Sequence, residues 1–393
     1  MKFDKTILNA FGQIETPFYY YDTALLGQTF DAARQASLQI PNTTVHFAVK
    51  SNANPRVLQY VRDAGFGADC VSGGEIELCI KAGISADKIM FAGVGKTDKE
   101  IMLAISNDIL CFNVESLEEL DIINQLAGQM DKTVNVALRI NPNIDAHTHE
   151  YITTGLEDNK FGIALDDMLK AVKHAINLPN VNYYGLHFHI GSQILNYNSF
   201  RILSSRINKI QDALEAAGIQ TCSINVGGGL GIDYDKPHDN SLPDFNKYFA
   251  TFKKYLHLRP NQVIHCELGR ALSAQWGSLI TRTIFVKRTR TKRFAIVDAG
   301  FTELIRPALY QAHHKIINLS ATDKKRHRYD VVGPICESTD TFGTDELLPT
   351  VERGHLLAIL SAGAYGEVMA SQYNCRPLVK AYCTEDIIKQ SGH

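Results

Sequence analysis

The most informative stretch of this sequence is YYGLHFHIGS, residues 183–192. It begins as an apolar run of strand length and ends on His189, Gly191 and Ser192. Two later runs end in a similar way, one on Gly227-Gly228-Gly229 and one on Glu267-Leu268-Gly269-Arg270. Such endings are typical of folds that carry their chemistry at the carboxyl ends of parallel strands.

Apolar runs of this kind recur along the first 270 residues. Most are unbroken rather than alternating, which is the pattern of parallel strands buried on both faces. The eight runs are Val45–Val49, which closes on Lys50, then Ala68–Val71, Ile89–Val94, Ile109–Val114, Val134–Ile140, Tyr183–Ile190, Cys222–Val226 and Val263–Leu268.

Helix-start signals lie in the gaps between these runs. Asn54 is followed by Pro55, a pair typical of an N-cap and the first helical position. A hydroxyl residue precedes a glutamate by three positions, as in a capping box, at Ser72, Thr97 and Ser116. Strands that alternate with helices in this way predict an α/β fold, specifically a (β/α)8 TIM-like barrel.

The predicted barrel spans residues 25–270, and the pattern of strand and helix signals changes after it. Strand-like runs then follow without strong helices between them: Leu279–Val286, Arg293–Val297, Tyr329–Val332 and His355–Leu360. Thr16–Tyr21 is also strand-like. Residues 1–24 and 271–393 are therefore predicted to form a β domain, of β-barrel or sandwich type, that includes the N-terminal strand. The long connection 141–163 is expected to be a lid or binding loop on the barrel's catalytic face.

Charge and hydropathy argue against several classes of protein. The chain has 40 basic and 42 acidic residues, and this net charge of −2 gives no general attraction to nucleic acid or anionic membranes. Two local basic runs, Lys287–Arg293 and Lys324–Arg328, are interpreted as solvated turns. Met1–Lys5 contains an acidic residue and leads into no apolar segment, so we expect no signal peptide; no apolar stretch approaches the roughly 20 residues of a membrane span.

The cysteines point to a reducing compartment. The chain has 8 of them without a CxxC pair, a pattern typical of reduced, mostly buried thiols. Several lie inside apolar runs: Cys70, Cys111, Cys222 and Cys266. We therefore expect a cytoplasmic protein with neither nucleic acid nor membrane among its partners.

Strand ends of a barrel converge on one mouth, so residues far apart in sequence become neighbours. There, Lys50 supplies an amine, His189 a flat ring and Glu267 a carboxylate. An amine can bind an aldehyde, a carboxylate can pair with a ring nitrogen, and glycine N–H groups can approach a phosphate. The combination predicts a site for pyridoxal 5'-phosphate.

Each motif alone also has an ordinary explanation. A lysine at a strand end is often a solvated terminator, three glycines can be only a turn, and Glu267 can pair with a neighbouring arginine or lysine. The pairs His187/His189 and His147/His149 raise the alternative of a metal site. No Cys, Asp or Glu joins the first pair at ligand spacing, and a single glutamate adjoins the second. We expect no metal.

Together the motifs resemble the fold-type III pyridoxal-phosphate decarboxylases, most closely the branch that acts on diaminopimelate. The similarity runs from Thr16 to Pro377, almost the whole chain. The segments that carry it in the barrel are Ala48–Asn52, Gly67–Glu75, His187–Gln193, Gly227–Gly229 and Glu267–Arg270.

The resemblance implies a role for each of these strand ends. Lys50 would hold the cofactor covalently, His189 would stack on its ring, and Glu267 would pair with the ring nitrogen. The remaining cofactor-binding residues that it implies are Asp69, Arg139, Ser192, Gly227, Gly228, Gly229, Gly269, Arg270 and Tyr365.

The substrate residues implied by the resemblance lie mainly in the C-terminal region. Leu304–Tyr310 is similar to the family's carboxylate-binding segment, with Arg306 and Tyr310 on the substrate, alongside Arg270 and Tyr365. Gly333–Ser338 is similar to the segment that the family donates across a homodimer interface. Cys336 is then the proton donor, and Glu337 binds the distal ammonium group. Glu367, where many relatives have an apolar residue, departs from the pattern.

The implied activity is a carboxy-lyase reaction that converts meso-2,6-diaminopimelate to L-lysine and CO2, the last step of lysine biosynthesis. Decarboxylases of the same fold that act on ornithine, arginine or carboxynorspermidine are alternatives, against which Glu337 and the Arg306–Tyr310 segment argue. An amino-acid racemase is disfavoured by Glu267, since racemases of this fold usually place an arginine by the ring nitrogen. A non-catalytic, cofactor-binding regulatory relative is disfavoured by the intact Lys50, Glu267 and Cys336.

Overall fold

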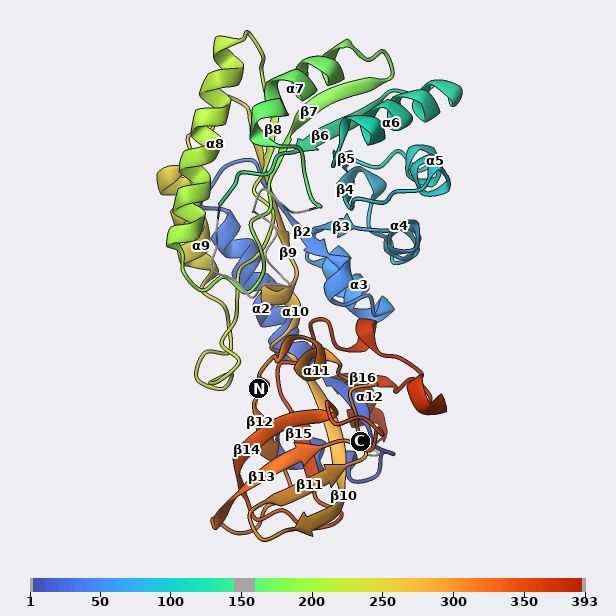
Figure 1. The fold of residues 1–393 in the computed structure, drawn as a ribbon, viewed down its shortest axis with the longest axis vertical. Helices are drawn as coiled ribbons and strands as arrows, with labels where there is room; N and C mark the ends of the chain where they lie inside the picture. The colour runs from blue at the N-terminus through green and yellow to red at the C-terminus, as the bar shows by residue number, and fades with distance from the viewer. Residues whose placement is uncertain (1–2, 145–159, 391–393) are drawn as a thin grey trace. The chain divides into compact units, whose positions relative to one another are not determined.

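The computed structural model of the chain describes residues 3–144 and 160–390, which form two compact units (Figure 1). The first, here called the barrel unit, comprises Phe30–Gly231 and Asp244–Arg270. The second, the β unit, comprises Met1–Thr29, Ile232–Pro243 and Ala271–His393.

Eight parallel strands close the barrel unit in sequence order, and the last strand pairs with the first. The strands are β2 (Thr43–Ala48), β3 (Gly67–Cys70), β4 (Ile89–Phe91), β5 (Cys111–Val114), β6 (Val134–Arg139), β7 (Val181–His187), β8 (Ser223–Asn225) and β9 (Val263–Leu268). Each overlaps one of the eight predicted apolar runs, so the predicted (β/α)8 barrel is confirmed.

Helices follow the barrel strands (Figure 1). They are α2 (Thr23–Ser37), which precedes β2 and is shared with the β unit, α3 (Pro55–Asp63), α4 (Gly73–Lys81), α5 (Asp98–Ser106), α6 (Leu117–Gln129), α7 (Met168–Asn177), α8 (Asn198–Ala216), α9 (Phe245–Tyr255) and the short α10 (Arg270–Ser273). Short 3-10 turns lie at Val49–Ser51, Ala86–Lys88 and Leu165–Asp167.

The predicted helix starts are confirmed, and two of them also fix strand ends. Thr97 and Glu100 form a complete capping box at α5. At α4 and α6 the serine caps the third amide as expected, but the glutamate reaches one residue further back. Glu75 accepts from the Val71 amide at 2.7 Å and Glu119 accepts from the Glu115 amide at 2.8 Å. Each glutamate thus ties its helix to the strand that precedes it.

The long connection after β6 is described only at its two ends. Its described ends meet in a parallel bridge between Ile140 and Ile163. Residues 145–159, with the predicted His147/His149 pair, lie outside the described residues.

The β unit is built on a mixed sheet in the order β12-β15-β10-β11-β13-β14, with β1 paired to β10 and β16. Its strands are β1 (Phe18–Tyr21), β10 (Gly277–Arg288), β11 (Arg293–Val297), β12 (Ile316–Asn318), β13 (Arg326–Val332), β14 (Thr341–Pro349), β15 (Leu356–Ile359) and β16 (Ala381–Cys383). Three short helices accompany them: α1 (Lys5–Phe11), α11 (Arg306–Tyr310) and α12 (Thr384–Gln390). Short 3-10 turns lie at Glu367–Met369 and Tyr373–Cys375. The N-terminal strand joins this sheet as predicted, since β1 runs antiparallel to β10.

The thiols are mostly buried, as predicted, but one of those in the apolar runs is not. None of the eight thiols is in a disulfide, and most are buried, but Cys222 is exposed. It lies just before β8, which begins at Ser223, so the apolar run extends one residue beyond the buried strand at its amino end.

Two negative findings concern the described part of the chain. No helix there is long and apolar enough to cross a membrane. No group of three or more His, Cys, Asp or Glu side chains among residues 3–144 and 160–390 is arranged to hold a metal ion.

Candidate active site

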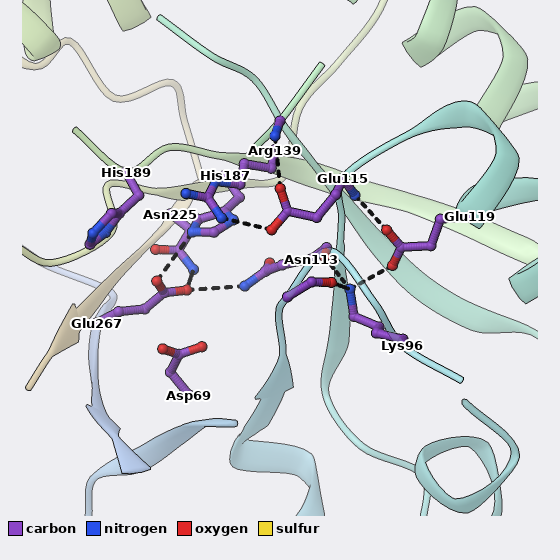
Figure 2. Close-up of polar contacts among 12 residues, drawn as sticks. Asp69, Lys96, Asn113, Glu115, Glu119, Arg139, His187, His189, Asn225 and Glu267 are labelled. Carbon is purple, nitrogen blue, oxygen red and sulfur yellow. Dashed lines mark hydrogen bonds and ion pairs between the residues drawn. The ribbon is translucent and has the colours of Figure 1, made fainter. Parts of the chain in front are cut away.

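The centre of the barrel mouth is a buried carboxylate, Glu267 near the end of β9 (Figure 2). Its Oε1 accepts from the Nδ2 of Asn113 at 3.0 Å and of Asn225 at 2.6 Å. Its Oε2 lies 3.1 Å from Nε2 of His187. Burial alone raises the pKa of Glu267, but His187 and then Lys50 outweigh it and hold this pKa well below the usual range. Glu267 is therefore ionised at neutral pH.

Lys50 lies in the 3-10 turn that follows β2, and its ammonium group faces Asp69. The Nζ atom is 3.1 Å from Oδ2 of Asp69, whose side chain is completely buried while that of Lys50 is 40% exposed. Burial, and then the charge of Glu267, raise the pKa of Asp69 to about 6. The second oxygen of Asp69 is buried and has no hydrogen-bond partner within the described residues.

β7 ends at His187, and His189 lies beyond this end. The regular alternation of side chains along a strand therefore does not put the rings of His187 and His189 on one face. Its Nδ1 accepts a hydrogen bond from the Gly228 amide at 3.3 Å. Burial, followed by the charges of Arg139 and Lys50, lowers the pKa of His189 to about 3. The ring is therefore neutral, with its proton on Nε2, and suited to packing on a flat molecule.

The glycine turn leaves no room for side chains. A Cβ added to Gly228 would lie 1.9 Å from the Glu267 carbonyl oxygen, and one on Gly229 would lie 2.5 Å from that of Gly191. Gly229 also has a φ of +99°, which disfavours any other residue. The turn consequently presents bare backbone beside the end of β7.

Arg270 and Ser192 meet next to this turn. Arg270 begins α10 directly after Gly269, and its Nη2 donates to the Ser192 hydroxyl at 2.9 Å. The arginine is buried at 6% exposure. A guanidinium group, a hydroxyl group and glycine backbone are the groups that bind phosphate well.

Arg139, at the end of β6, belongs to a second buried ion pair. Its Nη1 lies 2.7 Å from Oε1 of Glu115, and its guanidinium carbon is 4.6 Å from the centre of the Phe161 ring. The other oxygen of Glu115 accepts from the Gly162 amide at 2.8 Å. Arg139 is thus fixed between β5 and the described end of the long connection.

A buried lysine, Lys96, supports the end of β5. Lys96 has a side chain that is 1% exposed, and its Nζ contacts Glu119 at 2.5 Å (Figure 2). It also donates to the carbonyl oxygens of Gly93 and Asn113, each at 2.8 Å. Lys96 therefore holds the backbone of β5 at the residue whose side chain reaches Glu267.

The barrel mouth fits pyridoxal phosphate on its own geometry. It offers an accessible amine at Lys50, an ionised carboxylate at Glu267 and a phosphate-type corner at Arg270. The buried and unpartnered oxygen of Asp69 also marks a place where a donor is missing. An aldehyde, a ring nitrogen and a phosphate match these three features.

Apart from Arg270, the predicted substrate residues lie in the β unit, where Arg306 is the best fixed. It is 5% exposed, and its Nη1 contacts the Tyr234 hydroxyl at 3.0 Å and Nε2 of His314 at 2.8 Å. The other nitrogen of His314 lies 2.9 Å from the Leu360 carbonyl oxygen and must donate to it. Its Nε2 is then an acceptor for the guanidinium group. Tyr310 ends the same short helix, α11, and is partly exposed.

Cys336 and Glu337 lie on an exposed turn between β13 and β14. Asp340 shapes this turn, because its carboxylate accepts from the amides of Ile335 and Phe301, each at 2.7 Å. Glu337 accepts from the Tyr373 hydroxyl at 3.0 Å.

Tyr365 and Glu367 follow β15. Tyr365 has a φ of +54°, unusual for a tyrosine, and its side chain is half-buried. Glu367, the residue that departs from the family pattern, accepts from the Tyr21 hydroxyl at 2.5 Å. The carboxylate therefore has a specific partner within the β unit.

Comparison with known proteins places this site in a family. A family model described as pyridoxal-dependent decarboxylase, pyridoxal binding domain, matches residues 26–274. The chain belongs to this family of decarboxylases. The family and the cofactor predicted from the sequence are thereby confirmed.

Two relatives and one structural neighbour illustrate the comparison. A diaminopimelate decarboxylase from Bacteroides thetaiotaomicron is 54% identical over 97% of this chain and 98% of its own. The crystal structure of diaminopimelate decarboxylase from Helicobacter pylori complexed with L-lysine is 39% identical, with a TM-score of 0.90 over 96% of this chain and 94% of its own. An arginine decarboxylase from Paramecium bursaria Chlorella virus is 21% identical, with a TM-score of 0.84 over 96% of this chain and 99% of its own. The last likeness shows the shared fold alone.

Several site residues of this decarboxylase were missed by the sequence reasoning. Asn113 and Asn225 hold Glu267, and the hydrogen bonds described for the Glu267 carboxylate within residues 3–144 and 160–390 come from these two amides and His187, not from the arginine or lysine anticipated as its alternative partner. The available signal was a polar amide inside an apolar strand run, since such a group must find a buried partner.

Proposed function

We propose that this protein removes CO2 from meso-2,6-diaminopimelate and releases L-lysine, with pyridoxal phosphate as cofactor. The observation that carries the proposal is the 54% identity to a diaminopimelate decarboxylase over nearly the whole of both chains. The L-lysine complex of the Helicobacter pylori relative fits the same product.

The bound cofactor supplies an electron-accepting ring that stabilises the negative charge left when a carboxylate departs as CO2. In our proposal Lys50 anchors it covalently, and the neutral His189 ring packs on its face. Arg270 and Ser192, with the glycine turn, hold its phosphate. Glu267 holds a proton on the ring nitrogen, which strengthens the ring's capacity to accept electrons.

Arg139, Asp69, Gly269 and Tyr365 complete the cofactor residues in this proposal. Asp69 lies 3.1 Å from Nζ of Lys50, so it orients the amine. Arg139 is held by Glu115 at 2.7 Å and lies in the barrel mouth close enough to depress the pKa of His189.

Apart from Arg270, the β unit supplies the substrate residues in this proposal. Arg306 presents a planar fork suited to a carboxylate, while Tyr310 and Tyr365 line the substrate. Glu337 accepts from the distal ammonium group, and Sγ of Cys336 donates a proton to the substrate carbon after CO2 has left. Residues 25–270 would then bind the cofactor, and residues 1–24 and 271–393 would supply the substrate and interface residues.

We further propose a cytoplasmic homodimer with shared sites and no nucleic-acid partner. The Cys336–Glu337 turn is exposed in the single chain, as a segment donated to a second subunit would be. Eight thiols without a disulfide suit a reducing compartment.

The test is CO2 release from a panel of amino acids by the purified holoenzyme. We expect turnover of meso-diaminopimelate and rejection of lysine, ornithine and arginine by up to about 10⁴ in kcat/KM, since a site built for a distal carboxylate leaves its groups unpaired without one. Comparable values for ornithine would overturn the substrate and leave the decarboxylase intact. No CO2 from any amino acid would overturn the activity.

A further inference from the structure

The Glu267 carboxylate is held by a set of side chains that the chemistry above does not use. Three donors surround it: the amides of Asn113 and Asn225 on Oε1, and the His187 ring on Oε2. They come from three different strands, β5, β8 and β7 (Figure 2). We call these three residues the Glu267 cradle.

The orientation of both amides follows from their neighbours. Oδ1 of Asn225 accepts from the Gly227 amide at 2.9 Å, and a backbone N–H can only donate. The Nδ2 group must therefore face Glu267. Asn113 is fixed through its backbone, because its carbonyl oxygen accepts from Lys96 at 2.8 Å. Its Oδ1 is buried and has no hydrogen-bond partner in the described chain, so its NH2 group is the part that is used.

A count of acceptor positions shows what the cradle leaves open. An ionised carboxylate has about four lone-pair positions, two on each oxygen. The described contacts of Glu267 fill both positions on Oε1 and one on Oε2. A single position on Oε2 remains for a further donor. These contacts fix the orientation of the Glu267 carboxylate, because its rotation would break two amide hydrogen bonds.

We propose that Asn113, Asn225 and His187 are positioning residues that keep Glu267 ionised and direct one lone pair of Oε2 toward the protonated ring nitrogen. This proposal rests on the proposed role of Glu267. In this proposal four residues on different strands, Glu267 and its cradle, together keep the cofactor's ring nitrogen protonated, and not one carboxylate alone.

Asn225 has a second task within this unit. Its two ends contact Glu267 and the first residue of the glycine turn at 2.6 and 2.9 Å. The residue proposed to hold the ring nitrogen and the turn proposed to hold the phosphate are thus braced by one amide. Loss of Asn225 is expected to disturb both ends of the cofactor, whereas loss of Asn113 is expected to disturb the ring end alone.

The experiment uses holoenzyme loaded with cofactor that carries ¹⁵N at the ring nitrogen. The ¹⁵N chemical shift separates the protonated from the unprotonated ring, independently of turnover. In Asn113→Leu, which keeps the volume and removes the donor, the ring should lose its proton at a lower pH than in the wild type. Because a hydrogen bond to a charged group is lost, kcat should fall by about tenfold or more with KM little changed. Asn113→Ser gives a second variant if the leucine form does not fold.

Asn225→Leu should show the same ring signal and also release cofactor more readily on dialysis. Asn135→Leu is the matched control, since Asn135 is on the adjacent strand β6 and its amide donates to the Leu110 carbonyl oxygen at 2.9 Å, not to Glu267. Its ring signal and kcat should match the wild type.

The Glu267→Gln variant distinguishes a failure of the proposed role of Glu267 from a failure of the cradle. If its ring stays protonated and its turnover is unchanged, the role of Glu267 is wrong and the cradle fails with it. If Glu267→Gln shifts the signal but both Asn113 variants leave it unchanged, only the cradle is wrong. In the Glu267→Gln background Asn113→Leu should have little further effect on kcat, whereas a merely structural role predicts additive losses.

Discussion

The barrel mouth and the Cys336–Glu337 turn supply the two halves of the proposed chemistry, yet they are built very differently. Glu267, His187 and Asn225 are buried and joined by hydrogen bonds from several strands. Cys336 and Glu337 lie exposed on a single turn, where Glu337 contacts Tyr373. The network around Glu267 is already organised within one chain. An exposed proton donor such as Cys336 instead needs a second surface to enclose it. The predictions below test this difference.

The largest effect is expected at Lys50. Lys50→Ala removes the proposed covalent anchor, and turnover should fall by about 10³ or more. Borohydride reduction of the wild-type holoenzyme followed by peptide mapping should place the pyridoxyl group on Lys50. A pyridoxyl group found on Lys96 would reverse the assignment of the two lysines.

Arg306→Ala should rank next. It removes the guanidinium group proposed for the distal carboxylate, and kcat/KM for diaminopimelate should fall by about 10²–10³ while the rate with ornithine hardly changes. Arg282→Ala is a suitable control, because Arg282 lies on β10 in the same unit and donates to the Gly354 carbonyl oxygen at 3.1 Å. Equal losses with both substrates would mean that Arg306 maintains the fold and does not read the substrate.

Mixing two inactive variants tests whether the exposed turn serves a second subunit. Lys50→Ala chains and Cys336→Ala chains, dissociated and reassembled together, should recover about a quarter of the wild-type activity. Half of a random mixture is heterodimer, and each symmetric heterodimer has one intact site of two. Activity that stays at the level of the separate variants, with heterodimers demonstrated by mass, would place both residues in a site within one chain.

Glu75 should make the stability of the barrel depend on pH. Burial raises the pKa of this carboxyl to about 7. A pKa raised on folding gives stability that is present below the unfolded value and is lost as the pH rises through the folded value. Between pH 5 and 8, Glu75→Gln should therefore gain about 1–3 kcal/mol in unfolding free energy relative to the wild type, as measured by urea denaturation of the apo form. Glu77→Gln, at an exposed position on the same helix, should follow the wild-type pH dependence.

The smallest effect is expected at the capping box of α5. Thr97→Ala removes the cap that accepts from the Glu100 amide and should lower the unfolding free energy by about 1 kcal/mol. Ser106→Ala, near the other end of the helix, should change it by less than about 0.5 kcal/mol. Similar values for the two variants would show that the box contributes no more than an ordinary exposed hydroxyl group.

The barrel could be predicted because its signals are local. An unbroken apolar run such as Val263–Leu268 and a cap such as Ser72 each specify their element within a few residues. Long helices without such signals were harder: α8 begins after Tyr197, which makes no side-chain cap. In the β unit the polar strand β14, with buried residues only at intervals, left no apolar run to recognise.

The site was predictable in its parts but not in its connections. Lys50, His189 and Glu267 could be proposed because each lies at or just beyond the end of an apolar run. The partners of Glu267 depend on which strands face one another across the barrel, and no local pattern reports that. Asn113 and Asn225, 112 positions apart in sequence, meet on one oxygen atom only because the sheet closes. Cys222 was misplaced for the opposite reason, since an apolar residue beside a strand looks like part of it.

Lys96 has a consequence for chemical selectivity. Lys96 is a further primary amine of the barrel unit that could attack an aldehyde, yet its three N–H groups are committed to Glu119 and to the carbonyl oxygens of Gly93 and Asn113. Loss of the Lys96 proton, which attack on an aldehyde requires, would leave the buried Glu119 without a counter-charge. The reaction of Lys96 with an aldehyde is therefore strongly disfavoured. Lys50 is more exposed and is restrained by Asp69. Burial, hydrogen bonding and ion pairing thus distinguish two chemically identical amines, and the more exposed Lys50 is the one left to react with an aldehyde.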